Sequence, residues 1–135
     1  MKPKRRKPTV QRRALPAPPI DIRRGDVLWI SCDPSIGTEP NKTRTCVVVS
    51  NDIANRYGLA IAVIPTQSYT AERAGRAYMA DLRPPRSNLD AARVANASMV
   101  MTYDRARVVG RAGRVSAQAM TDIERALRMH LELGA

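Results

Sequence analysis

Short apolar runs separated by polar turns dominate the chain from residue 27 to residue 115. β-Branched and aromatic residues fill residues 27–32, and residues 46–49 (CVVV) form the most apolar run, which is typical of a buried central strand. A third strand is predicted over residues 59–64, ended by Pro65. Further strands are expected at residues 77–82, 95–103 and 108–115.

Helical patterns are few and lie between and after these strands. A helical turn is predicted over residues 53–57 with Gly58 as its end, and the polar segment 67–76 is predicted as a loop or a short helix. A longer helix begins at the N-cap Ser116 and runs to about residue 133, with Gly134 as its stop signal. Its apolar positions keep to one face: Met120, Ile123, Leu127 and Leu131. The pattern predicts a mainly β fold with helical additions (α+β), a small and strongly bent β-barrel with a C-terminal helix.

Charge divides the chain into two parts. The 135 residues carry a formal net charge of +11, and residues 1–13 contribute seven Lys or Arg and no acid, which leaves +4 for the rest. Prolines at positions 16, 18 and 19 form a stiff spacer after this basic run. We therefore expect a basic, Pro-rich, disordered arm over residues 1–20 and a barrel domain over residues 21–135. The arm is either a solvated tail or a tether for nucleic acid, because clustered Lys and Arg release counterions from phosphates.

Composition excludes several kinds of chemistry. One histidine and two distant cysteines cannot easily supply a zinc site or a catalytic triad, and the sequence has no Gly-rich phosphate loop. We expect no metal and no cofactor. No apolar run reaches the roughly 18 residues of a membrane span, and no signal peptide is recognisable, so a soluble, cytoplasmic protein with no membrane contact is expected. Cys32 and Cys46 are expected to be small core residues in a reducing compartment, and Trp29 a core or interface residue.

Five short motifs in residues 24–56 resemble the MazF/PemK toxin family. They are RGDVLW at 24–29, DP at 33–34 with GTE at 37–39, Arg44, VVVSND at 47–52, and NR at 55–56; residues 101–105 resemble a later family segment less specifically. The resemblance implies a dimeric SH3-like barrel of the MazF/PemK/CcdB type, the toxin component of a type II toxin–antitoxin system. It implies a metal-independent, sequence-selective endoribonuclease that cleaves single-stranded RNA and leaves a 2′,3′-cyclic phosphate and a 5′-hydroxyl. It also implies inhibition by a cognate antitoxin protein whose C-terminal segment occupies the RNA groove.

Such cleavage is chemically reasonable without a metal. RNA carries its own nucleophile, the 2′-hydroxyl, so the protein must align it, accept its proton and stabilise the extra negative charge on the phosphate. Arginine suits the last task because it stays protonated and offers a planar fork of donors to two phosphate oxygens.

Two residues correspond to the family's catalytic positions. Arg44 matches the catalytic arginine, although Thr45 follows it where the family usually has proline; this departure either loosens the strand entry or adds a hydroxyl to the site. The catalytic threonine corresponds to Thr66 or to Gln67, depending on a one-residue deletion in the preceding turn. Thr66 is preferred because the position needs a hydroxyl. A general base is not identified, since Glu39 and Asp52 are only carboxylates near the right loops.

RNA contacts are expected from two polar loops. In each loop, ordinary solvated side chains are the alternative interpretation. Arginines would grip phosphates and a tyrosine would stack on a base, and the residues expected to bind RNA are Asn41, Lys42, Thr43, Gln67, Tyr69, Arg73 and Arg76. Met99 and Met101 stand where the family more often has polar or basic residues, so they could instead fill an apolar seam.

Two other functions are compatible with the same fold. The first is a non-catalytic nucleic-acid-binding barrel, which the Thr45 departure and the uncertainty over Thr66 keep open. The second is a gyrase poison like CcdB, against which the retained Arg44 loop argues.

Overall fold

A computed structural model describes residues 20–32 and 43–134 of the chain. Residues 1–19 of the expected basic arm and the expected RNA contacts Asn41 and Lys42 lie outside the described residues. Two 3₁₀ turns, η1 and η2, interrupt the second half of the chain. In chain order the elements are β1 (Asp26–Ser31), β2 (Thr43–Val48), α2 (Asp52–Tyr57), β3 (Ala60–Ser68), α3 (Ala71–Ala74), β4 (Met79–Asp81), β5 (Arg93–Asn96), η1 (Ala97–Met99), β6 (Met101–Asp104), η2 (Arg105–Arg107), β7 (Val108–Arg114) and α4 (Ala117–Leu131).

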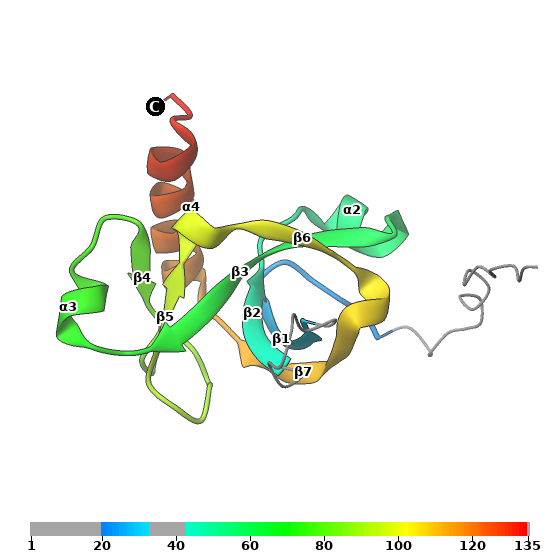
Figure 1. The fold of residues 1–135 in the computed structure, drawn as a ribbon, viewed down its shortest axis with the longest axis horizontal. Coiled ribbons are helices and arrows are strands. Elements are labelled where there is room, and N and C mark those ends of the chain that lie inside the picture. Colours follow the sequence, from blue (N-terminus) through cyan, green and yellow to red (C-terminus); the bar gives the residue numbers. More distant parts are fainter. Residues whose placement is uncertain (1–19, 33–42, 135) are drawn as a thin grey trace, which may run out of the picture.

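The strands form one curled antiparallel sheet in the order β4-β5-β3-β2-β1-β7, with β6 paired to β3 off this path. β3 is the shared strand: it pairs with β2 and β6 over residues 60–65 and then with β5 over Thr66–Ser68. Figure 1 shows β3 running from the α2 side of the molecule to the α3 side, with β1, β2, β6 and β7 curled around one half. The predicted bent barrel with a C-terminal helix is confirmed, although no ladder between the described strands closes it.

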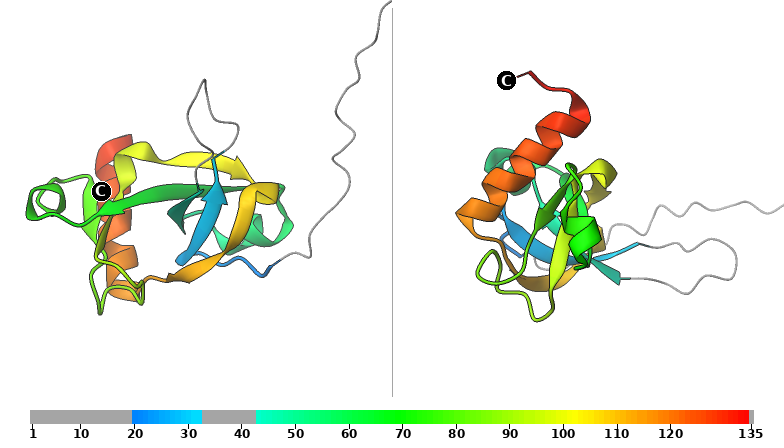
Figure 2. Two further views of the ribbon diagram at one scale, coloured as in Figure 1. Left: turned by 60° about the horizontal axis from the view of Figure 1, so that its bottom comes forward. Right: turned by 90° about the vertical axis from the view of Figure 1, so that its left-hand side faces the viewer.

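Two apolar clusters occupy the two faces of this sheet. Alternation along β2 places Val47 in one cluster and Cys46 and Val48 in the other. The first cluster includes Ile64, Leu82 and Ile123 and lies between the sheet and α4, which packs against β4 and η1 (Figure 2). The second fills the barrel and contains Ile22, Leu28, Ile30, Ile61 and Val63.

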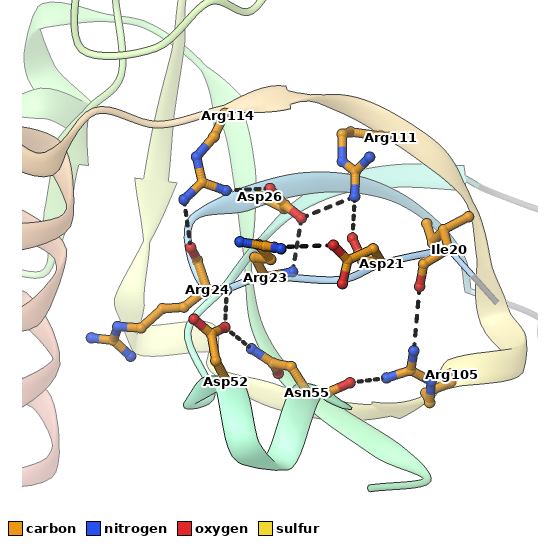
Figure 3. A network of polar contacts seen from close by, with 10 residues as sticks. All are labelled: Ile20, Asp21, Arg23, Arg24, Asp26, Asp52, Asn55, Arg105, Arg111 and Arg114. Carbon is orange, nitrogen blue, oxygen red and sulfur yellow. Dashed lines mark hydrogen bonds and ion pairs between the residues drawn. The ribbon is translucent and has the colours of Figure 1, made fainter. Parts of the chain in front are cut away.

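A buried carboxylate links the turn before β1 to β7. Asp26, only 3% exposed, accepts hydrogen bonds from the Arg23 backbone N–H at 2.8 Å, from Arg111 Nη2 at 3.1 Å and from Arg114 Nη1. These contacts make the centre of the network in Figure 3. Two guanidinium groups and a backbone donor balance the cost of burying this charge.

The α2 turn is fixed to the same network through its first residue. Asp52 Oδ1 accepts from the Arg24 backbone N–H at 2.7 Å and from Asn55 Nδ2 at 3.0 Å. Both hydrogen bonds favour the ionised form and hold the pKa of the Asp52 carboxyl below its ordinary value. Asn51 caps the helix, its side chain accepting from the Ala54 N–H at 2.8 Å, and Gly58 ends it as predicted.

Several predicted boundaries are wrong, each for an identifiable reason. Pro65 does not end β3, because it stands where that strand leaves β6 and meets β5, and the missing N–H costs no ladder bond there. The single strand expected over residues 95–103 is two strands, β5 and β6, separated by η1, whose N-cap is Asn96. Gly134 does not end α4, since Glu132 adopts the left-handed conformation at the C-cap, with φ of 57°. Met99 and Met101 do not fill a seam within the described chain, being 48% and 41% exposed.

Candidate functional site

A groove of about 580 Å³ opens on the face where β1, β2, β3, β5 and β7 approach one another. Three arginines and one aspartate line it, so its charge is predominantly positive. Its lining residues are Trp29, Thr43, Arg44, Thr45, Thr66, Leu89, Asp90, Ala91, Arg93, Arg111 and Ala112. Trp29 is 42% exposed here, so its expected place in the core is wrong and only its place at an interface stays a prediction.

Thr66 stands at the centre of a short polar chain in this groove. Continuing the β2–β3 register, in which Cys46 lies opposite Pro65, places Thr45 opposite Thr66. The two hydroxyl oxygens are 2.6 Å apart, a hydrogen bond between side chains on adjacent strands. Thr66 is 3% exposed, whereas Thr45 at the groove wall is partly exposed.

Arg93 on β5 holds Thr66 from the opposite side. Its Nε donates to the Thr66 hydroxyl at 2.9 Å and its Nη2 to the Thr66 carbonyl oxygen at 2.9 Å, so two adjacent donors of the planar group bind one residue. A longer contact of 3.4 Å joins Nη1 to the Ser68 hydroxyl. Partial burial, and then the charge of Arg73, lower the pKa of the Arg93 guanidinium from its ordinary value.

Arg44 enters the groove differently. It lies opposite Ile30 in the β1–β2 register, and alternation gives it the face of β2 opposite to that of Thr45. It is exposed and lines the groove. Within residues 20–32 and 43–134, no acceptor forms a hydrogen bond or an ion pair with its guanidinium group. The structure therefore brings Arg44 and Thr66 to one groove without a direct bond between them, and leaves the Arg44 charge accessible to a ligand.

The other residues expected to bind RNA divide into two groups. Thr43 is exposed and lines the groove at the start of β2. Gln67 does not line it; its side-chain carbonyl accepts from Asn96 Nδ2 at 3.0 Å.

The remaining three lie around α3, away from the lining of the groove. Arg73 donates to the Ser68 carbonyl oxygen at 2.7 Å, and Arg76 bonds Glu72 and the Tyr78 hydroxyl, each at 3.1 Å. The Arg83 guanidinium stacks 3.9 Å from the centre of the Tyr69 ring.

Sequence reasoning missed Arg93 and Asp90, which also line the groove. Arg93 escaped notice because the strand that carries it is expected from the pattern only at residue 95, two residues too late. Residues 93–96 (RVAN) do not alternate: a partly buried arginine precedes three buried residues, so the local pattern does not mark Arg93 as a site residue. Asp52, considered as a carboxylate near the site, instead anchors α2.

The described residues contain neither a candidate metal site nor a candidate membrane-spanning helix. No three His, Cys, Asp or Glu side chains come together there in a group that could hold a metal ion. Across the same residues, no helix has both the length and the apolar character needed to cross a membrane.

Comparison with known proteins identifies a family and a shared fold. Residues 23–131 match the family model described as PemK-like, MazF-like toxin of type II toxin–antitoxin system. The chain is 33% identical over 117 residues to the endoribonuclease MazF9 of Mycobacterium tuberculosis, covering 83% of this chain and 98% of that protein.

Solved structures share the fold at lower identity. A MazE–MazF crystal structure from Deinococcus radiodurans superposes with a TM-score of 0.71 at 18% identity, covering 85% of this chain and 99% of that one. A mycobacterial endoribonuclease in complex with its cognate antitoxin superposes with a TM-score of 0.68 at 18% identity, covering 84% of this chain and 98% of that one.

Proposed function

We propose, from the premise that this chain belongs to the PemK-like, MazF-like toxins of type II toxin–antitoxin systems, that it is a metal-independent endoribonuclease. Its substrate is single-stranded RNA, cleaved by attack of the 2′-hydroxyl on the adjacent phosphorus to leave a 2′,3′-cyclic phosphate and a 5′-hydroxyl. The relative that is 33% identical is named an endoribonuclease, and the match covers 98% of its length, which supports this activity.

One observation carries the proposal. Arg44 is accessible and has no acceptor among the described residues, and it lines the same positive groove as the hydrogen-bonded hydroxyl of Thr66. The Arg44 guanidinium can bind the phosphate and stabilise the charge that grows on it in the transition state. Thr66 assists by hydrogen bonding. Thr66 suits the family's second site position better than Gln67, because Thr66 lines the groove while Gln67 bonds Asn96 outside it.

The remaining expected RNA contacts follow the path of a strand that extends beyond the groove. Thr43 lines the groove itself, and Asn41 and Lys42 precede it in the chain. Tyr69, Arg73 and Arg76 lie around α3 and would meet RNA only after giving up their local contacts. Gln67 would likewise have to release Asn96.

Partners and location follow from the family. We assign to this chain a cognate antitoxin that covers the groove, as supported by the mycobacterial relative solved with its antitoxin. We also assign it a homodimeric state and a cytoplasmic location, where its RNA substrate would be found.

The test is cleavage of single-stranded RNA in the presence of EDTA. Wild-type protein should cleave and yield cyclic-phosphate ends, whereas Arg44→Ala should cleave about a hundredfold more slowly, as expected for loss of one transition-state donor. Arg56→Ala is the matched control, since it removes an exposed arginine from α2, outside the groove.

Four outcomes would contradict the proposal. Cleavage that stops in EDTA would point to a metal-dependent nuclease, and unchanged cleavage by Arg44→Ala would remove Arg44 from the mechanism. RNA bound without any cleavage would indicate a non-catalytic binding barrel, and inhibition of a topoisomerase with intact RNA would indicate a gyrase poison.

A further inference from the structure

The hydrogen bond between Thr45 and Thr66 has a direction that the surrounding donors determine. Each hydroxyl carries one proton and two acceptor lone pairs. The two oxygens lie 2.6 Å apart, so one of the two protons is used between them. The other proton is left for a partner outside the pair.

Arg93 fixes the acceptor side of Thr66. A guanidinium group has donors and no acceptor, so its Nε can only donate to the Thr66 oxygen at 2.9 Å. Its Nη2 donor is occupied by the Thr66 carbonyl oxygen, which holds the planar group in place. Thr66 therefore accepts from Arg93 in either arrangement of the hydroxyl pair.

Burial distinguishes the two arrangements. If Thr45 donated to Thr66, the Thr66 proton would have to find a partner from a residue that is only 3% exposed. If Thr66 donates to Thr45, the Thr66 hydroxyl has no unpaired proton, and the outward proton belongs to Thr45, which is partly exposed and lines the groove. The second arrangement leaves no buried donor unpaired in this pair, and its bonds run in one direction and reinforce one another.

We infer that Thr45 is the hydroxyl donor that meets the RNA, at the end of a relay from Arg93 N–H to Thr66 O–H to Thr45 O–H. This inference rests on the proposed function. Its ligand group is a phosphate oxygen, which accepts hydrogen bonds and cannot donate once ionised. Thr66 and Arg93 then assist cleavage as positioning residues. Thr45, which stands where the family usually has proline, is the member of the relay that touches the substrate, beside Arg44.

The test compares an isosteric loss of the hydroxyl with its conservative replacement. Thr45→Val removes the hydroxyl and keeps the shape, and Thr45→Ser keeps the hydroxyl. Two readouts are measured: cleavage of RNA, and the Kd for a 2′-deoxy oligonucleotide of the same sequence, which cannot be cleaved. Thr45→Val should lose about tenfold in both, as for a hydrogen bond to a charged group, and Thr45→Ser should restore most of the loss. Thr102→Val is the matched control, an exposed strand threonine on β6 outside the groove.

A double variant tests the relay itself. Thr66→Val should lose about as much as Thr45→Val, and Thr45→Val/Thr66→Val should lose no more than about twofold beyond either, since both changes break one chain. Losses that multiply in the double variant would overturn the relay. Thermal unfolding checks that each variant is folded, and if Thr66→Val unfolds, the Thr45 pair decides alone.

The two hypotheses fail in different ways. If the wild-type protein binds the oligonucleotide but cleaves no RNA, the proposed function is wrong, and the Kd values of the Thr45 variants still decide the inference. Thr45→Val with wild-type Kd and wild-type cleavage would overturn the inference while leaving the endoribonuclease intact. Absence of any binding by the wild-type protein would overturn the inference as well.

Discussion

Within the described chain, carboxylates pair with several arginines, Arg111 of the groove among them, but not with Arg44 or Arg93. Asp26 binds Arg111 and Arg114, and Asp122 binds Arg86 and Arg125. Arg93, by contrast, bonds only neutral oxygens among the described residues. Arg44 likewise has no carboxylate partner there. Arg44 and Arg93 therefore bring positive charge without a carboxylate partner in the described chain to a groove where a polyanion could bind.

The buried thiol of Cys46 gives a pH prediction. Burial, and next the neighbouring Cys32, raise the pKa of Cys46 to about 12 from 9.0, while Arg44 acts in the opposite direction. Because the folded pKa is higher than the unfolded one, the associated stability is complete below pH 9 and is lost as the pH rises toward 12. Urea unfolding at pH 8, 9 and 10 should show the free energy of unfolding falling, and Cys46→Ala should flatten that fall while lowering stability at every pH.

Tyr103 provides the control for this measurement. Burial, and then its hydrogen bond to Cys32 at 3.5 Å, also raise the pKa of Tyr103 to about 12. Tyr103→Phe removes this second alkaline contribution and leaves that of Cys46. If the free energy of unfolding falls equally with pH in Tyr103→Phe and in Tyr103→Phe/Cys46→Ala, Cys46 ionises normally in the folded protein.

Helix α4 begins at an N-cap, Ser116, whose side-chain hydrogen bond can be removed by one substitution. Ser116 Oγ accepts from the Ala119 N–H at 3.1 Å, satisfying one free donor at the start of the helix. Ser116→Ala should lower the free energy of unfolding by about 1 kcal/mol, and Ser116→Asp should restore it. Thermal or urea unfolding measures the change, and Ala117→Ser is the neighbouring control. A change within error for Ser116→Ala would mean that packing of Ile123 and Ala126 alone holds the helix.

The apolar pattern predicted elements best where local signals agree with tertiary pairing. Residues 27–32 and 46–49 read as strands because continuous apolar runs are buried on both faces of the sheet, as the two clusters require. The N-cap at Ser116 was likewise predictable, because a helix cap depends only on residues within one helical turn. The partner change of β3 at Pro65 could not be predicted from the local pattern, because it depends on partners 25–29 residues away in β5 and 38–44 residues away in β6.

The candidate site was only partly predictable for the same reason. Motif resemblance pointed to Arg44 and Thr66, and both line the groove. Arg93 reaches Thr66 from 27 residues away, and no local pattern announces a contact that only the β3–β5 pairing creates. Thr45 departs from the proline that the family usually has at this position. Its closeness to Thr66 follows from the β2–β3 register, which the sequence alone does not predict.

At the scale of the whole molecule, the groove lies where the two halves of the sheet meet. β3 pairs with β2 and β6 on one side of Pro65 and with β5 from Thr66 onward. Thr66 is thus the first residue after the partner change, held by β2 through Thr45 and by β5 through Arg93. A change in how the two halves of the sheet pack would alter the Thr45–Thr66 and Arg93–Thr66 hydrogen bonds together. The geometry of the site therefore depends on how the two halves are joined.

Residues 1–13, the basic N-terminal segment, add positive charge that has no role in the proposed cleavage step. Replacing its seven Lys and Arg by Gln reduces the formal net charge from +11 to +4 without shortening the chain. Each phosphate of single-stranded RNA that a protein neutralises adds about 0.7 to the slope of log affinity against log salt. We expect the variant to show a shallower salt dependence, by about 0.7 for each phosphate that the segment no longer neutralises, in fluorescence anisotropy with a 2′-deoxy oligonucleotide.

The pattern of RNA cleavage should stay the same in this variant, because Arg44, Thr45 and Thr66 are untouched. A protein whose residues 1–13 are scrambled in order is the matched control: it keeps the charge and should keep the wild-type slope, since counterion release depends on charge and not on sequence. An unchanged slope in the Gln variant would mean that the segment does not contact RNA. A changed cleavage pattern would mean that it selects the site of cutting, and so acts as more than an electrostatic tether.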